Sequence, residues 1–279
     1  MGASAQLALA AHMHQDDRSA SSDTGGDEMA RGEITGRIAG LALSPFTGLI
    51  SAARHSRMFH PSGILCAAEA EPIAAVGAAG ELAARLAGPV LVRWSSAWWK
   101  TGEWIDVLGC ALRFSEAPLG VEPKPSDQDL LLATIQRPWT MPFAPLTTHD
   151  HDFFANTYYG VSPFDVAPLG RIEWRLRPEG APSLYRGTRE ERIAYRIDNG
   201  SASLFLDWSA YAGPLKRPIA ARFEPLLRVR LSGLLDLDQR DLRFDPFRSG
   251  RGIEPVGFVH NLRRAAYWTS QRSRPSGSD

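Results

Sequence analysis

The sequence predicts an α+β fold that is mainly β: an antiparallel β-barrel of about eight strands with flanking helices. From residue 63 onward, short apolar or alternating runs are separated by glycine and proline, which is the pattern of strands joined by turns. The composition, 44% hydrophobic and 22% charged over 279 residues, is ordinary for a globular protein that buries a substantial core. A β-sandwich is the main alternative to a closed or nearly closed barrel.

The first part of the chain differs from the rest in composition. Residues 1–33 are rich in Ala, Ser, Asp and Gly, and they predict a flexible tail because they bury too little apolar area to offset their ordering entropy. A helical segment is expected over 33–55, and a short helix with a glycine stop over 74–88. The predicted strands cover residues 64–74, 89–99, 109–116, 129–136, 171–180, 193–198, 203–211 and 226–235.

The end of the chain is predicted to form a helix over 260–274, after a turn-rich segment at 250–257. Three strongly polar side chains and one phenol fall within about 80° of one face of this helix: Arg263, Tyr267, Gln271 and Arg274. Such a face is unusual on a helix that only buries apolar surface, although a polar outer face on a terminal helix is the simpler interpretation. The expected organisation is a tail (1–33), one domain (34–274) and a disordered C-terminus (275–279).

Charge, apolar runs and cysteine content limit the partners and the cellular location that can be expected of this protein. The formal net charge is zero, from 31 basic and 31 acidic residues, so no nucleic-acid partner is expected. No apolar run reaches the length of a membrane span and the start lacks the basic region of a signal peptide, so the cytoplasm is the expected location. Cys66 and Cys110 are embedded in apolar sequence, which predicts buried thiols in a reducing compartment.

Two further stretches carry candidate site residues. RMFHPSG places His60 just before the first predicted strand, and VRWSS places Arg93 and Ser95 two residues apart, hence on one face of a strand. An arginine buried in such a strand needs an anion or a hydrogen-bond partner. Taken singly, each residue has a simpler explanation: a structural histidine, an aromatic packing residue at Tyr267, and a structural ion pair at Arg93.

Together, these stretches resemble the haem-dependent catalase family, in the family's order and over roughly residues 45–274. Arg-x3-Tyr-x3-Gln-x2-Arg resembles its proximal haem helix, and RMFHPSG resembles the stretch that bears its distal histidine. VRWSS resembles its Val-Arg-Phe-Ser strand, and DVLGCALRF its Pro-Arg-Gly-Phe-Ala-Val-Lys-Phe strand. The resemblance implies a catalase-like barrel with a C-terminal haem-ligand helix, and haem b (iron protoporphyrin IX) as the cofactor.

On the iron's proximal side, the resemblance implies that Tyr267 binds ferric iron as a phenolate. Because a free phenol has a pKa of about 10, the phenolate needs the metal and a neighbouring cation, which Arg263 would supply. Gln271 lies on the same helix face as part of the cofactor-binding set.

On the distal side, the resemblance implies that His60 is the acid–base group and that Ser95 bonds its other ring nitrogen. The haem propionates would be bound by Arg57, Arg93 and Arg274.

The sequence also departs from the family's pattern. The strand resembling DLLLATIQ carries, in catalases, an asparagine that helps the histidine hold hydrogen peroxide; here the corresponding position is Thr134, whose hydroxyl is a single donor. We therefore expect weak catalase activity at most. The chain has no match to the family's long amino-terminal arm, wrapping segment or helical carboxy-terminal domain, so the expected type is the small catalase-related haem peroxidase.

Several aromatic and polar residues remain to be assigned. Four tryptophans are candidates for lining a substrate entrance, and packing at a barrel rim explains them equally well: Trp94, Trp98, Trp99 and Trp104. Trp139 and Phe143 are expected to pack against the porphyrin. The HDHD run at 149–152 has no third ligand nearby in sequence, so it is interpreted as a solvated turn or a helix cap rather than a metal site.

The leading functional expectation is a haem-dependent peroxidase that takes organic hydroperoxides or hydrogen peroxide together with a small organic reductant. One alternative is a catalase-like hydroperoxide isomerase or peroxygenase in a biosynthetic pathway, acting on a lipid-like hydroperoxide. Another is a non-enzymatic β-barrel that binds haem or a small ligand. Catalase relatives are oligomeric, so a homodimer is an open possibility.

Overall fold

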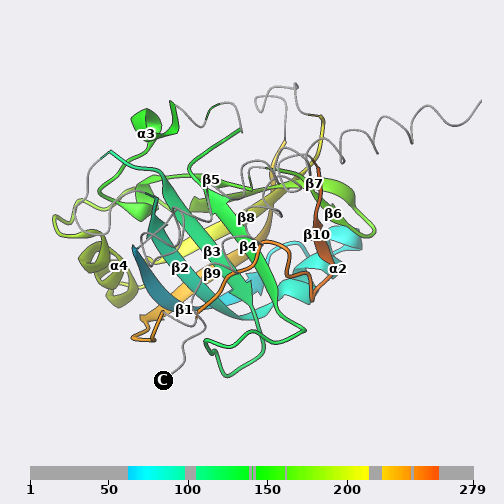
Figure 1. The fold of residues 1–279 in the computed structure, drawn as a ribbon, viewed down its shortest axis with the longest axis horizontal. Helices are drawn as coiled ribbons and strands as arrows, with labels where there is room; N and C mark the ends of the chain where they lie inside the picture. Colours follow the sequence, from blue (N-terminus) through cyan, green and yellow to red (C-terminus); the bar gives the residue numbers. More distant parts are fainter. Residues whose placement is uncertain are drawn as a thin grey trace, which may run out of the picture.

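The computed structural model describes residues 62–97, 105–137, 140, 143–160, 162–213, 222–239 and 242–257. Its centre is a closed barrel of eight strands in which every neighbouring pair is antiparallel, in the order β7-β5-β4-β3-β2-β1-β9-β8 (Figure 1). Pairing of β7 with β8 closes the ring, so the predicted barrel is confirmed and the sandwich is wrong. β6 and β10 extend the sheet beyond β7.

The described strands are β1 (Ser62–Pro72), β2 (Gly88–Ser96), β3 (Leu108–Phe114), β4 (Gln128–Ala133), β5 (Tyr158–Tyr159), β6 (Phe164–Val166), β7 (Gly170–Pro178), β8 (Ser203–Ala210), β9 (Glu224–Leu234) and β10 (Ile253–Pro255). The described helices are α2 (Gly77–Leu86), α3 (Ala144–Thr147), α4 (Arg189–Asp198) and the short 3₁₀ helix η2 (Phe153–Ala155).

Seven of the eight predicted strands are confirmed, and the one predicted over 193–198 is wrong because these residues belong to helix α4. The residues just before 193 explain why the segment is a helix. Thr188 accepts a hydrogen bond from the backbone N–H of Glu191, whose side chain bonds back to Thr188, which forms a capping box. Arg189, Ile193 and Arg196 then share one buried face at helical spacing. The helix predicted over 74–88 is confirmed as α2, and Gly88 has the positive φ (108°) expected of a glycine stop.

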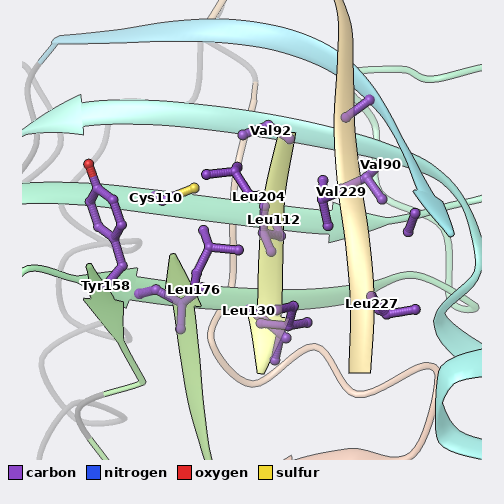
Figure 2. Close-up of a cluster of buried hydrophobic side chains, with 14 of the residues drawn as sticks. Val90, Val92, Cys110, Leu112, Leu130, Tyr158, Leu176, Leu204, Leu227 and Val229 are labelled. Atoms are coloured by element: carbon purple, nitrogen blue, oxygen red, sulfur yellow. The ribbon is translucent and has the colours of Figure 1, made fainter. Parts of the chain in front are cut away.

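The inside of the barrel is filled by alternate apolar residues of all eight strands. Figure 2 shows ten of them pointing toward one another: Val90, Val92, Cys110, Leu112, Leu130, Tyr158, Leu176, Leu204, Leu227 and Val229. Cys66 and Cys110 are buried free thiols in this core, as predicted. Burial raises the pKa of Cys66 to about 12, so it is a protonated packing residue at neutral pH.

One end of the barrel is closed by aromatic packing. The Trp94 ring lies 5.2 Å from Phe153, 5.5 Å from Phe154 and 5.6 Å from Tyr158, measured between ring centroids. Trp94 is fully buried, so packing rather than an entrance explains it; Trp98, Trp99 and Trp104 lie outside the described residues. Arg189 and Arg196 of α4 lie over the Phe153 and Phe154 rings.

Other expectations fall on parts of the chain that the structure does not describe. These are the tail over 1–33, the helical segment over 33–55, the terminal helix over 260–274 with its haem-ligand face, and the C-terminus at 275–279. In the described part of the chain, no helix combines the length and the apolar character needed to cross a membrane.

Candidate functional site

The outer face of the barrel carries a row of small residues across its first four strands. Ser95 on β2 pairs with Gly63 on β1 and with Gly109 on β3, and Gly109 pairs with Ala133 on β4. These four residues alternate with the core residues of their strands, so they point away from the inside of the barrel. We call them the small-residue row. Across four strands spaced by about 4.8 Å, the row extends for about 14 Å.

The outer face on both sides of this row is covered. On one side, Leu242 and Phe244 pack against the outward residues Leu65, Leu91 and Ala111. On the other side, Ala97, Val107 and Ile135 pack with Ala133 and with Ala144 of helix α3. The middle of the small-residue row, Ser95 and Gly109, therefore lies between two covered areas of the same sheet, and Ala133 at its end belongs to one of them.

Arg93 lies directly beside the row, two residues before Ser95 on β2 and on the same face, as predicted. Its side chain is only 5% exposed, and its Nε donates to Oε1 of Gln239 at 3.1 Å. The guanidinium rests on Gly63, because a Cβ added there would lie 2.7 Å from Cζ and Nε of Arg93. Glycine is therefore the residue that lets this cation lie flat against β1.

Ser95 is buried at 4% exposure, and its hydroxyl donates to the carbonyl oxygen of Gly109 at 3.4 Å. Its predicted partner, His60, lies outside the described residues, so the distal pair stays a prediction. Nearby, one carboxylate oxygen of Asp106 accepts from the backbone N–H groups of Ala97 (3.2 Å) and Val107 (2.7 Å). This buried carboxylate holds together the ends of β2 and β3 next to Ser95.

Thr134, the predicted distal donor, follows the row rather than belonging to it. Its hydroxyl oxygen accepts from the backbone N–H of Leu108 at 3.2 Å and lies 2.8 Å from the hydroxyl of Thr148. The residue in line with Ser95 on β4 is Ala133, which sequence reasoning missed. Finding it requires the pairing register of β3 with β4, because a shift of one residue exchanges the two faces of a strand. The catalytic role of Thr134 stays a prediction.

The described residues that would suit a planar, anionic cofactor such as haem are Arg93 and the small residues beside it. At the middle of the row, Ser95 and Gly109 present no side chain larger than a hydroxymethyl group, while the Arg93 guanidinium lies on Gly63 at one end and Ala133 packs against Ala97, Val107 and Ile135 at the other. Arg93 adds a cation at the edge of this surface, suited to a carboxylate. The other proposed cofactor contacts lie outside the described residues: Arg57, Arg263, Tyr267, Gln271 and Arg274.

A buried ion-pair cluster holds the covering segment on the outer face. Asp129 is fully buried; it accepts from Nε of Arg113 at 2.9 Å, from a guanidinium nitrogen of Arg248, and from the backbone N–H of Asp245 at 2.8 Å. Burial raises the pKa of Asp129, and the two arginines oppose this rise. Because Asp245 and Arg248 belong to the segment that carries Phe244, this cluster fixes the border of the area beside the row.

The remaining candidates are structural or surface residues. Asp152 accepts from the backbone N–H of Phe154 at 2.8 Å and caps η2, which confirms the helix-cap interpretation of the HDHD run. Within the described ranges, no three His, Cys, Asp or Glu side chains gather in a way that would hold a metal ion. Phe143 is 63% exposed, and Trp139 lies outside the described residues, so packing of either against a porphyrin stays a prediction.

Comparison with known proteins supports the fold of the chain. No protein-family model and no curated protein matches the chain. Among solved structures, the chain is similar to a fungal catalase, with a TM-score of 0.57 and 13% sequence identity over 78% of this chain. The match spans 59% of the length of that catalase chain. At this identity the likeness shows the fold alone: the chain has a catalase-like antiparallel β-barrel.

Proposed function

We propose that this protein is a haem-dependent peroxidase that uses organic hydroperoxides or hydrogen peroxide and has weak catalase activity at most. The observation that carries the proposal is the small-residue row on the outer face of β1 to β4, with Arg93 beside it. The catalase-like fold and the ordered resemblance of four sequence stretches to catalases support the same assignment.

In this proposal, the small-residue row would face haem b, and Arg93, together with Arg57 and Arg274, would bind its propionates. Tyr267 would hold the iron, with Arg263 favouring its phenolate form. When bound, the haem supplies the redox chemistry that reduces a peroxide at the expense of a second substrate. The protein contributes position, charge and proton transfer.

Proton transfer falls to His60, with Ser95 holding its ring. His60 would accept a proton from the peroxide and give it to the departing oxygen, so that water or an alcohol can leave when the O–O bond breaks. A small organic reductant supplies two electrons and two protons, which gives one alcohol and one water from an organic hydroperoxide.

Ala133 supports peroxidase rather than catalase chemistry. Its methyl group, in line with Ser95 across Gly109, donates no hydrogen bond to a second peroxide molecule. By analogy with oxyanion donors, loss of one such donor costs about 3 kcal/mol of transition-state stabilisation. Hydrogen peroxide disproportionation is therefore expected to be slow.

Exposed apolar side chains near the row favour a second candidate, a hydroperoxide isomerase or peroxygenase that acts on a lipid-like substrate. Ile105, Phe143 and Leu146 are 58%, 63% and 75% exposed, and they adjoin Val107 and Ala144 in the chain, at the covered border of the row. Such side chains offer an apolar surface to a hydrocarbon chain.

The test is to reconstitute the purified protein with haem and follow turnover of a lipid hydroperoxide with and without a phenolic reductant. Peroxide-dependent oxidation of the phenol is expected for the peroxidase. Rearranged or oxygenated lipid products formed without the phenol would favour the second candidate instead. His60→Ala is expected to keep haem and lose turnover, and an unchanged rate in this variant would contradict the role of His60. If the wild-type protein binds haem and turns over neither substrate, the protein is a carrier.

A further inference from the structure

Gln239 connects the two strands on which the proposed haem site is built. It follows β9, on a segment anchored where the backbone N–H of Leu235 donates to the carbonyl oxygen of Leu65 at 2.8 Å. Nε2 of Gln239 donates to the carbonyl oxygen of Gly63 at 2.7 Å, and its Oε1 accepts from Nε of Arg93 at 3.1 Å. One amide group thus bonds β1 with its donor end and β2 with its acceptor end.

These contacts fix the direction of the Arg93 guanidinium. An arginine side chain has several rotatable bonds, but its charged group is planar. One face of that plane rests on Gly63, where an added Cβ would lie 2.7 Å from Cζ, Nε and Nη2 of Arg93. The bond from Nε to Gln239 sets the rotation of the plane within that contact. With both constraints, Cζ, Nε and Nη2 of Arg93 stay against Gly63, at the β1 end of the small-residue row.

We propose that Gln239 is a positioning residue that holds Arg93 ready to bind a carboxylate of the planar ligand on the small-residue row. This inference rests on the proposed haem site and names the residue that prepares its cation. The same amide also anchors the start of β1, three residues after His60. Preorganisation of this kind raises affinity because the arginine loses little freedom when the ligand binds.

If Gln239 only stabilises the fold, a different result is expected, and haem dimethyl ester distinguishes this structural role from a positioning role. The ester keeps the ring and the iron but has no free carboxylates, so it gains nothing from an oriented arginine. A scaffold effect weakens haem and its ester equally, whereas a positioning effect weakens haem alone.

The experiment measures the dissociation constants of haem and of haem dimethyl ester, by absorbance titration, for wild type, Gln239→Ala and Gln239→Glu. Gln128→Ala is the matched control. Its amide also bridges distant segments, donating to the carbonyl oxygens of Arg248 (2.7 Å) and Ile253 (3.2 Å), without contacting Arg93. Thermal unfolding of each protein shows whether it is folded.

We expect Gln239→Ala to weaken haem binding about tenfold, the order of one charge-assisted hydrogen bond, and to change binding of the ester by less than about twofold. Gln239→Glu keeps the shape of the side chain but pairs its own carboxylate with Arg93, so haem binding is expected to fall further. Gln128→Ala is expected to lower the unfolding temperature and leave the haem-to-ester ratio unchanged. An equal loss for haem and ester in the Gln239 variants, or no loss, would refute the positioning role alone; a wild type that binds neither would refute the haem site as well.

Discussion

The substitution Gly63→Ala tests the outer-face site, because Gly63 contacts the guanidinium of Arg93. A methyl group at residue 63 would lie 2.7 Å from three atoms of the Arg93 guanidinium, closer than non-bonded atoms tolerate, so the guanidinium must move and release Gln239. Loss of a hydrogen bond to a charged group costs about 1.5–3 kcal/mol, and the stiffer unfolded chain returns about 0.4–1 kcal/mol. The expected net loss is roughly 1–2 kcal/mol, or about 2–8 °C in a chain of this size.

The control is Gly233→Ala on β9, where an added Cβ meets no atom within 4 Å. This variant is expected to be as stable as wild type or slightly more so, with unchanged haem affinity. Gly63→Ala is expected to bind haem about tenfold more weakly as Arg93 leaves its position. Thermal unfolding followed by circular dichroism, together with haem titration, measures both effects. If the two glycine variants behave alike in both assays, the reasoning about Arg93 is wrong.

Two further predictions concern the scaffold. Asp129→Asn leaves the buried Arg113 and the partly buried Arg248 without their shared carboxylate, and we expect urea unfolding to show a loss of roughly 3–5 kcal/mol in stability. Glu71→Gln, in an exposed ion pair, is expected to cost less than about 1 kcal/mol, and similar losses in the two variants would contradict this prediction. Alkaline pH should also destabilise the protein, because burial raises the pKa of Cys66 from 9.0 to about 12 and that of Tyr158 well above 10.0. The folded chain keeps protons that the unfolded chain releases. The stabilising contribution of Cys66 is therefore fully present below a pH of 9.0 and that of Tyr158 below a pH of 10.0. Above those values, each contribution falls by about 1.4 kcal/mol per pH unit. A thermal midpoint that stays level from about pH 8 to about pH 11 would contradict it.

The sequence predicts those features of the site that depend on local periodicity. In VRWSS, strand alternation alone predicts that Arg93 and Ser95 share a face opposite Trp94, and the structure confirms it. The barrel follows from the same alternation repeated along the chain. The prediction over 193–198 was wrong because six residues with Ile, Ala and Tyr look like a strand until the capping box that precedes them is included.

Features that depend on pairing between distant residues could not be predicted. The small-residue row exists only once the registers of β1 to β4 are known, and a one-residue difference decides whether Ala133 or Thr134 stands in line with Ser95. The bond from Arg93 to Gln239 joins residues 146 positions apart, and no local pattern marks either partner for the other. The two-residue strand β5 is too short to show any periodicity, yet it connects β4 with β7 in the barrel.

Every proposed role in this protein depends on haem binding to the catalase-like barrel through a tyrosinate ligand. The most direct measurement is the absorption spectrum of the protein reconstituted with ferric haem, recorded for wild type and for Tyr267→Phe. We expect a Soret band in wild type that disappears or shifts strongly in the variant. Identical spectra would contradict the ligand assignment, and a wild-type protein that takes up no haem would contradict the proposed function.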